Sequence, residues 1–95
     1  MNADVERVLA DSFRRDWARV VATLIGMTGD WDLAEESVQE AYSAALTAWR
    51  RDGIPDEPRA WLTTTARNRA VDRIRRSRVG AAKLRELVME PAADL

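Results

Sequence analysis

Apolar residues recur at three- and four-residue intervals along most of this 95-residue chain. This spacing places side chains on one stripe of an α-helix, and we find no segment with the two-residue alternation of a β-strand. Between Asp4 and about Met27 the stripe consists of Val5, Val8, Leu9, Phe13, Trp17, Val20, Val21, Leu24 and Ile25. The periodicity therefore predicts an all-α fold that opens with one long helix.

Two further long helices are predicted by the same spacing. Gly29 tolerates a positive φ and should end the first helix, and Asp32 should cap the second, with Glu35 at capping-box distance. The inward stripe of the second helix is Ala34, Val38, Ala41, Tyr42, Ala45, Leu46 and Trp49. Pro58 is expected near the first turn of a third helix, which runs to about Arg78.

A weaker segment, residues 81–89, permits a short fourth helix, and Pro91 onward is expected to be a frayed tail. We therefore predict a compact bundle of three long helices plus this short fourth helix. A chain of this length forms one hydrophobic core at most. The expected organisation is a single helical domain over residues 1–90, followed by residues 91–95 as a tail or the start of an interdomain linker.

The composition excludes several functional classes. The chain has neither Cys nor His, which removes disulfides, thiolate metal sites and the usual general base. Its only lysine is Lys83, and its four glycines are scattered and form no phosphate-binding loop. We expect no enzymatic activity, no cofactor and no metal. No apolar run approaches the roughly 18–20 residues of a membrane span, and the start lacks a basic signal region, so we expect a cytoplasmic protein without a membrane partner.

The charges are segregated along the chain although the net charge is only −1. Residues 1–58 carry six basic and twelve acidic side chains, whereas residues 59–85 carry nine basic side chains against Asp72 alone. Such asymmetry indicates two different partners, one basic and one polyanionic. The alternative is a domain whose two halves neutralise each other internally.

The predicted third helix has a polar half that combines several groups suited to nucleic acid. Leu62, Thr63, Ala66, Ala70 and Ile74 share the inward half, and the opposite half holds Trp61, Thr64, Thr65, Asn68, Arg69, Asp72, Arg75 and Arg76. Arg67 and Arg78 flank this surface. Guanidinium groups neutralise phosphates, Asn can bond a base edge, and Trp can stack on an unpaired base. The alternative is a solvated basic face with Trp61 packed against the 52–58 loop.

Arg73 differs from the other arginines of this helix. Its position leans toward the inward half. We therefore expect its side chain to extend along the surface toward solvent or to pair with another helix.

An acidic patch covers the start of the predicted second helix. Asp30, Asp32, Glu35, Glu36 and Glu40 lie within eleven residues that contain no basic side chain. Acids in the first turn of a helix are stabilised by its macrodipole, but Gln39 and Glu40 lie beyond that turn. A docking surface for a basic partner helix would account for them. A merely solvated polar face remains the alternative.

Two segments together resemble a known family. The segment from Asp32 to Tyr42, DLAEESVQEAY, resembles the polymerase-binding helix of bacterial sigma factors. The segment from Trp61 to Arg76, WLTTTARNRAVDRIRR, resembles the helix that recognises the promoter −10 element in the extracytoplasmic-function (ECF) group of the sigma-70 family. The resemblance covers roughly residues 9–78 and implies the sigma region 2 domain, a helical bundle. The loop DGIPDEP at residues 52–58, followed by RAWL, resembles the branch of this group that carries a long C-terminal extension.

The resemblance implies a role in transcription initiation and two partners. Asp32, Glu35, Glu36, Gln39 and Glu40 would face core RNA polymerase, with Glu36, Gln39 and Glu40 on the clamp helices of its largest subunit. Promoter DNA would be bound along the helix by the candidate residues Trp61, Thr64, Thr65, Arg67, Asn68, Arg69, Asp72, Arg75 and Arg76. Trp61, Thr65 and Asn68 would lie where duplex gives way to separated strands, and the four arginines would hold phosphates.

The loop would complete the DNA-binding surface. By resemblance, Asp52, Gly53, Ile54, Pro55 and Asp56 would cradle a base flipped out of the non-template strand, which costs a few kcal/mol of stacking. An anti-sigma factor is a further partner that the resemblance allows. Complete members also carry a helix-turn-helix domain that reads the −35 element, which this sequence, ending at Leu95, does not contain. The alternative function is a helical interaction module whose basic face docks an acidic protein.

Overall fold

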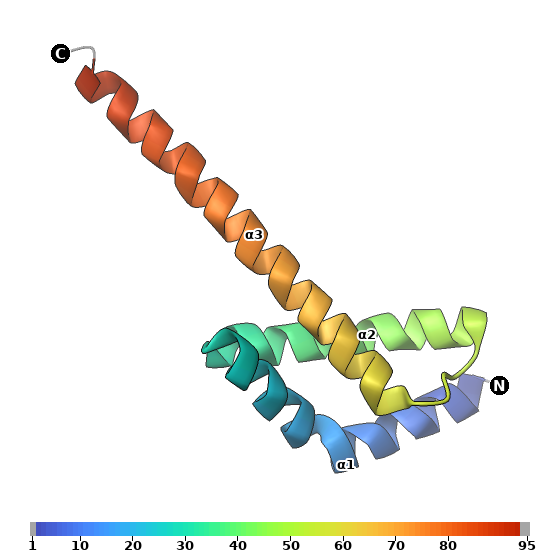
Figure 1. The fold of residues 1–95 in the computed structure, drawn as a ribbon. Helices are drawn as coiled ribbons and strands as arrows, with labels where there is room; N and C mark the ends of the chain where they lie inside the picture. Colours follow the sequence, from blue (N-terminus) through green and yellow to red (C-terminus); the bar gives the residue numbers. More distant parts are fainter. Residues whose placement is uncertain (1, 94–95) are drawn as a thin grey trace.

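The computed structural model describes residues 2–93, which form three helices and no strand (Figure 1). These helices are α1 (Asn2–Thr28), α2 (Trp31–Asp52) and α3 (Pro58–Ala93). The all-α class and the three predicted long helices are thus confirmed. None of the helices in the described part of the chain is both long enough and apolar enough to cross a membrane.

A tight turn joins α1 to α2. Gly29 has a φ of 69° and ends α1, and its N–H donates to the Ile25 carbonyl at 2.8 Å. Asp30 is the N-cap of α2, because its backbone is extended and its carboxylate accepts from the Leu33 N–H at 3.1 Å. The prediction that Asp32 caps α2 was therefore wrong. The left-handed turn at Gly29 makes Asp30, two positions before Asp32, the last residue before α2. Asp32 therefore lies inside the first turn of the helix.

The core lies where α1, α2 and the first half of α3 meet. It is built from the buried residues Val5, Leu9, Val20, Val21, Leu24, Ala34, Val38, Ala41, Ala45, Trp49, Leu62, Ala66 and Ala70. Alanines dominate the contributions of α2 and α3, and such small side chains let helix backbones approach closely. An ion pair of 2.8 Å between Arg50 and Glu6 links the end of α2 to the start of α1, so the two helices run antiparallel.

Polar side chains are buried between α1 and α2. Ser12 is fully buried and its hydroxyl lies 3.3 Å from an Asp16 carboxylate oxygen and 3.1 Å from the Tyr42 hydroxyl. Burial is the main cause that raises the pKa of Tyr42 above its usual value. Phe13, which the sequence pattern placed in the inward stripe, is half exposed, because Ser12 takes the neighbouring inward position.

Helix α3 continues far beyond the bundle, as Figure 1 shows. It runs unbroken to Ala93, and the short fourth helix expected over residues 81–89 is part of α3. The physical reason is that Gly80 costs only about 1 kcal/mol relative to Ala, and the alanines that follow it favour helix. The described chain is consequently elongated, with extents of 64 × 27 × 16 Å, and not uniformly compact. Residues 91–93 extend α3, residues 94–95 lie outside the described residues, and the domain boundary at residue 90 stays a prediction.

Candidate functional site

The exposed side of α3 carries the amide and the guanidinium groups that the sequence pattern selected. Asn68 and Asp72 are exposed, as are the arginines Arg67, Arg69, Arg75 and Arg76. Among the residues whose side chains the structure describes, none of these four arginines takes part in an ion pair. The basic face is therefore not neutralised by the acidic half of the domain. Because like charges along one helix repel, such a face favours a polyanionic partner.

Trp61 lies at the boundary between this face and the core. Its ring is half buried and packs edge-to-face on the buried Trp49, with ring centroids 5.4 Å apart and an interplanar angle of 71°. Thr64 is exposed, and Thr65, four residues along α3 from Trp61, is half buried. The expectation of a surface aromatic is met only in part, since one side of Trp61 is held by the core. A ring fixed in this way loses little conformational entropy when a base stacks on its free part.

The loop between α2 and α3 starts at a glycine-dependent turn. Gly53 has a φ of 97° and donates its N–H to the Trp49 carbonyl at 2.9 Å. Ile54 and Asp56 are exposed and Pro55 is half buried. Asp52, the last residue of α2, accepts two hydrogen bonds from the Arg51 guanidinium, at 3.0 and 2.8 Å. These bonds are the main cause that lowers the pKa of Asp52, so its carboxylate stays ionised and paired within α2.

The acidic residues of α2 have different environments. Asp32 and Gln39 are exposed, and Glu35 accepts a hydrogen bond of 3.0 Å from the Trp31 indole N–H. Glu36 and Glu40 lie one turn apart, and both face α3.

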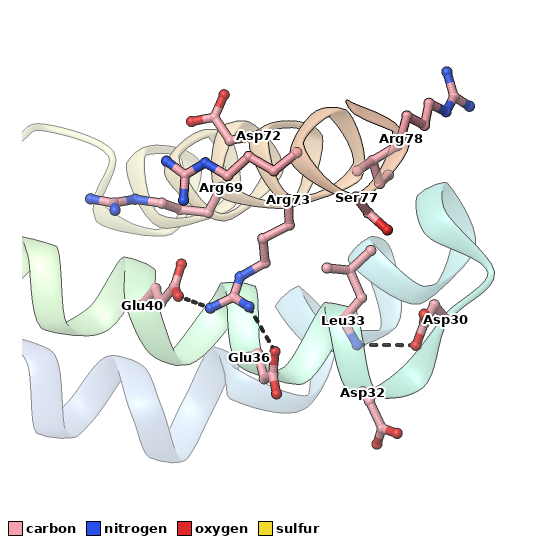
Figure 2. Close-up of a pocket in the computed structure, with 12 residues that line it drawn as sticks. Asp30, Asp32, Leu33, Glu36, Glu40, Arg69, Asp72, Arg73, Ser77 and Arg78 are labelled. Atoms are coloured by element: carbon pink, nitrogen blue, oxygen red, sulfur yellow. Dashed lines mark hydrogen bonds and ion pairs between the residues drawn. The ribbon is translucent and has the colours of Figure 1, made fainter. Parts of the chain in front are cut away.

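Arg73 of α3 occupies the space between these two carboxylates. Figure 2 shows its guanidinium reaching from α3 to both α2 side chains. One nitrogen donates to Glu36 at 3.0 Å and the other to Glu40. The hydrogen bond with Glu40 is the first cause that raises the pKa of Arg73. Of the two outcomes expected for Arg73, extension toward solvent or pairing with another helix, the structure shows the pairing. Through it, two of the five predicted polymerase-binding residues, Glu36 and Glu40, are engaged within the domain.

Two adjoining clefts follow the α2–α3 boundary on either side of this cluster. The larger, about 800 Å³, is lined from α2 by residues such as Asp32 and Glu36 and from α3 by Arg69 and Arg76. The smaller, about 510 Å³, is lined by Glu36, Gln39, Glu40, Ser43, Ala44, Arg69 and Arg73. The structure thus brings candidate residues of the two predicted surfaces into shared clefts. These shared clefts could not be predicted from the sequence, because residues 36–40 and 69–76 meet only through the packing of α2 on α3.

An apolar groove of about 460 Å³ lies on the other side of α2, against α1, and was not predicted from the sequence. Its apolar lining comes from Leu9, Phe13, Tyr42 and Leu46. Ser43 lines both this groove and the smaller cleft, so the two adjoin. Phe13 is 50% exposed and its ring lies 4.7 Å from that of Trp17 and 5.8 Å from that of Tyr42. A large exposed ring beside a polar face is typical of protein-docking surfaces.

Comparison with known proteins agrees with this arrangement. The family described as Sigma-70 region 2 matches residues 8–79. This match covers most of the chain, including most of α1, all of α2 and the residues that line the clefts along α3. The chain therefore belongs to the sigma-70 region 2 family.

Two curated relatives show more specifically which proteins the chain resembles. The chain is 36% identical over 69 residues to the ECF RNA polymerase sigma factor SigK of Mycobacterium ulcerans (strain Agy99), and this match covers 68% of the chain and 35% of that protein. It is also 47% identical over 60 residues to an uncharacterized protein of Rhizobium meliloti (strain 1021), covering 62% of the chain and 14% of that protein. No solved structure matches the chain significantly. The resemblance to the ECF group is confirmed, and the chain spans about a third or less of the length of these relatives.

Proposed function

We propose that this domain binds core RNA polymerase and promoter DNA in transcription initiation, and that α3 recognises and melts the −10 element. Membership of the sigma-70 region 2 family supports the general role. The surfaces described above support the assignment of each partner to particular residues. The domain would act in the cytoplasm as a binding module without catalytic activity of its own.

The observation that carries the DNA assignment is the exposed arginine face of α3, with Asn68 among the arginines. Arg67, Arg69, Arg75 and Arg76 are exposed and, within the described residues, form no ion pair. Each phosphate contact made by such a side chain releases condensed counterions, so binding should weaken steeply with salt. Asn68 provides two hydrogen-bonding groups for a base edge, and Trp61 and the Gly53–Asp56 loop lie at the N-terminal end of the same helix.

The polymerase assignment is supported by the outer surface of α2. Asp32 and Gln39 are exposed, Glu36 is exposed beside Arg73, and the apolar groove around Phe13 and Tyr42 adjoins this polar surface. A basic partner helix with an apolar side chain could satisfy both parts at once. By family resemblance this partner would be the clamp coiled coil of the polymerase's largest subunit.

Co-purification with core RNA polymerase tests the proposal most directly. Gln39→Ala should weaken retention of the polymerase because it removes an exposed amide from the proposed contact. Thr47→Ala is the matched control, since Thr47 is also an exposed residue of α2 but lines none of the clefts described here. Equal retention of the wild type and both variants would contradict the assignment of this face.

DNA binding needs a separate measurement. Single-stranded DNA that carries the −10 element should bind more tightly than a scrambled strand, and both affinities should fall as salt rises. If the chain instead binds an acidic protein and shows no affinity for either strand, the alternative of a protein-interaction module would replace this proposal.

A further inference from the structure

The Arg73 cluster joins the two proposed binding surfaces by a specific contact. Arg73 belongs to the DNA-binding helix α3, and both of its ionic partners, Glu36 and Glu40, belong to the acidic face of α2. The side chains remain reachable from solvent, with exposed fractions of 39% for Arg73, 59% for Glu36 and 34% for Glu40. In the free domain, Arg73 therefore holds two carboxylates that a basic partner would use.

Arg73 is also placed to join the basic face. Arg69 and Arg76 lie four residues before it and three residues after it, and residues at these spacings are neighbours on a helix surface. All three line the same cleft, and Arg69 and Arg76 are exposed. If Glu36 and Glu40 were taken by other cations, the Arg73 guanidinium would extend the row of positive charge formed by its two neighbours.

We infer that Arg73 is an electrostatic switch that couples the two binding events, so that a basic partner on Glu36 and Glu40 releases Arg73 for a DNA phosphate. This inference rests on the proposed function, because it takes the acidic face and the basic face as the two binding sites. Both partners favour the state in which the Arg73 cluster is open. Each therefore strengthens the binding of the other, and the coupling must be reciprocal.

The size of the coupling follows from the exposure of the cluster. An ion pair this accessible to water is weak, so thermal motion opens it readily and a partner can displace it at small cost. For a closed state favoured a few-fold over the open one, the coupling factor is about threefold in each direction. Higher salt should reduce it, because exposed charges are screened.

The experiment measures binding of the polymerase clamp coiled-coil fragment to the full chain by calorimetry, with and without a saturating short oligothymidylate. The wild type should bind the fragment about threefold more tightly when the oligonucleotide is present. Arg73→Gln removes the guanidinium from the cluster. This variant should bind the fragment about threefold more tightly than the wild type without DNA, and the oligonucleotide should add nothing further.

Arg69→Gln is the matched control. It removes the same charge from the same cleft, but Arg69 has no ionic partner among the described residues. It should lower affinity for DNA while the wild-type coupling persists. Thermal unfolding of each variant confirms that the bundle is intact.

The outcomes separate this inference from the proposed function. Coupling that persists in Arg73→Gln, or a gain in fragment affinity that is equal in Arg69→Gln, would show a general charge effect and would overturn the switch. Binding of both partners with no coupling in the wild type would overturn it as well, while the proposed function stands. Failure of the wild type to bind either the fragment or DNA would overturn the proposed function itself.

Discussion

Replacing Trp61 with alanine should destabilise the domain substantially, although Trp61 is not fully buried. Its ring makes an edge-to-face pair with Trp49 at 5.4 Å, and such a pair is worth about 0.5–1.5 kcal/mol beyond the area it buries. The buried half of the side chain adds about 1–1.5 kcal/mol of apolar transfer free energy. We therefore expect Trp61→Ala to lower the free energy of unfolding by about 1.5–3 kcal/mol.

Thermal unfolding followed by circular dichroism measures this loss. For a chain of this size, each kcal/mol shifts Tm by about 4–8 °C, so Trp61→Ala should lower Tm by about 6–24 °C. Trp31→Ala is a matched control, because Trp31 is 64% exposed and makes a single hydrogen bond to Glu35. That variant should change the unfolding free energy by no more than about 0.5 kcal/mol. Equal Tm shifts in the two variants would refute the assignment of Trp61 to the core boundary.

The same residue is a candidate for base stacking, so its two roles must be separated. Trp61→Phe keeps an aromatic ring against Trp49 and should cost less than about 1.5 kcal/mol. Below the unfolding temperature of every variant, loss of DNA affinity in Trp61→Ala together with its retention in Trp61→Phe would indicate stacking. If Trp61→Ala bound DNA as tightly as the wild type while folded, the ring would have a structural role alone.

Three further substitutions test other parts of the structure. Asn68→Ala should cost about 1–3 kcal/mol on −10 DNA and little on a scrambled strand, and equal losses in a titration of both strands would argue against base readout. Asp30→Ala should lower the free energy of unfolding, measured by chemical denaturation, by about 1 kcal/mol because it removes the N-cap of α2. Asp32→Ala should cost less, because Asp32 lies inside the first turn and does not cap the helix. Gly53→Ala should lower the free energy of unfolding by about 1–3 kcal/mol. No neighbouring atom obstructs a Cβ at this position, so the strain comes from the φ of 97° alone. An unchanged midpoint of unfolding would show that the loop can adopt another conformation.

The three long helices could be predicted from local chemistry. Apolar spacing gave their inward faces, and Gly29 and Pro58 marked an end and a beginning, because these residues act through their own backbone geometry. The exact cap of α2 could not be predicted, since Asp30 and Asp32 are chemically equal candidates. The turn at Gly29 selected Asp30. The continuation of α3 past residue 80 was missed because one glycine lowers helix stability without ending the helix.

In the candidate site, too, some features could be predicted from the sequence and others could not. The exposed arginines and Asn68 followed from the helical period, because exposure on one helix depends mainly on which face packs. The helical period could not predict the contact of Trp61 with Trp49 or the exposure of Phe13. Both depend on how helices from distant segments pack against one another.

By itself, the order of the residues determined the helical class, the separation of acidic and basic segments and the family to which the chain belongs, because periodicity, charge and motif spacing are local properties. The tertiary structure alone decided that Arg73 lies between Glu36 and Glu40 and that Arg69 shares their cleft. The physical reason is that an ion pair needs contact within a few ångströms. For residues more than thirty positions apart, that contact exists only after α3 has packed on α2.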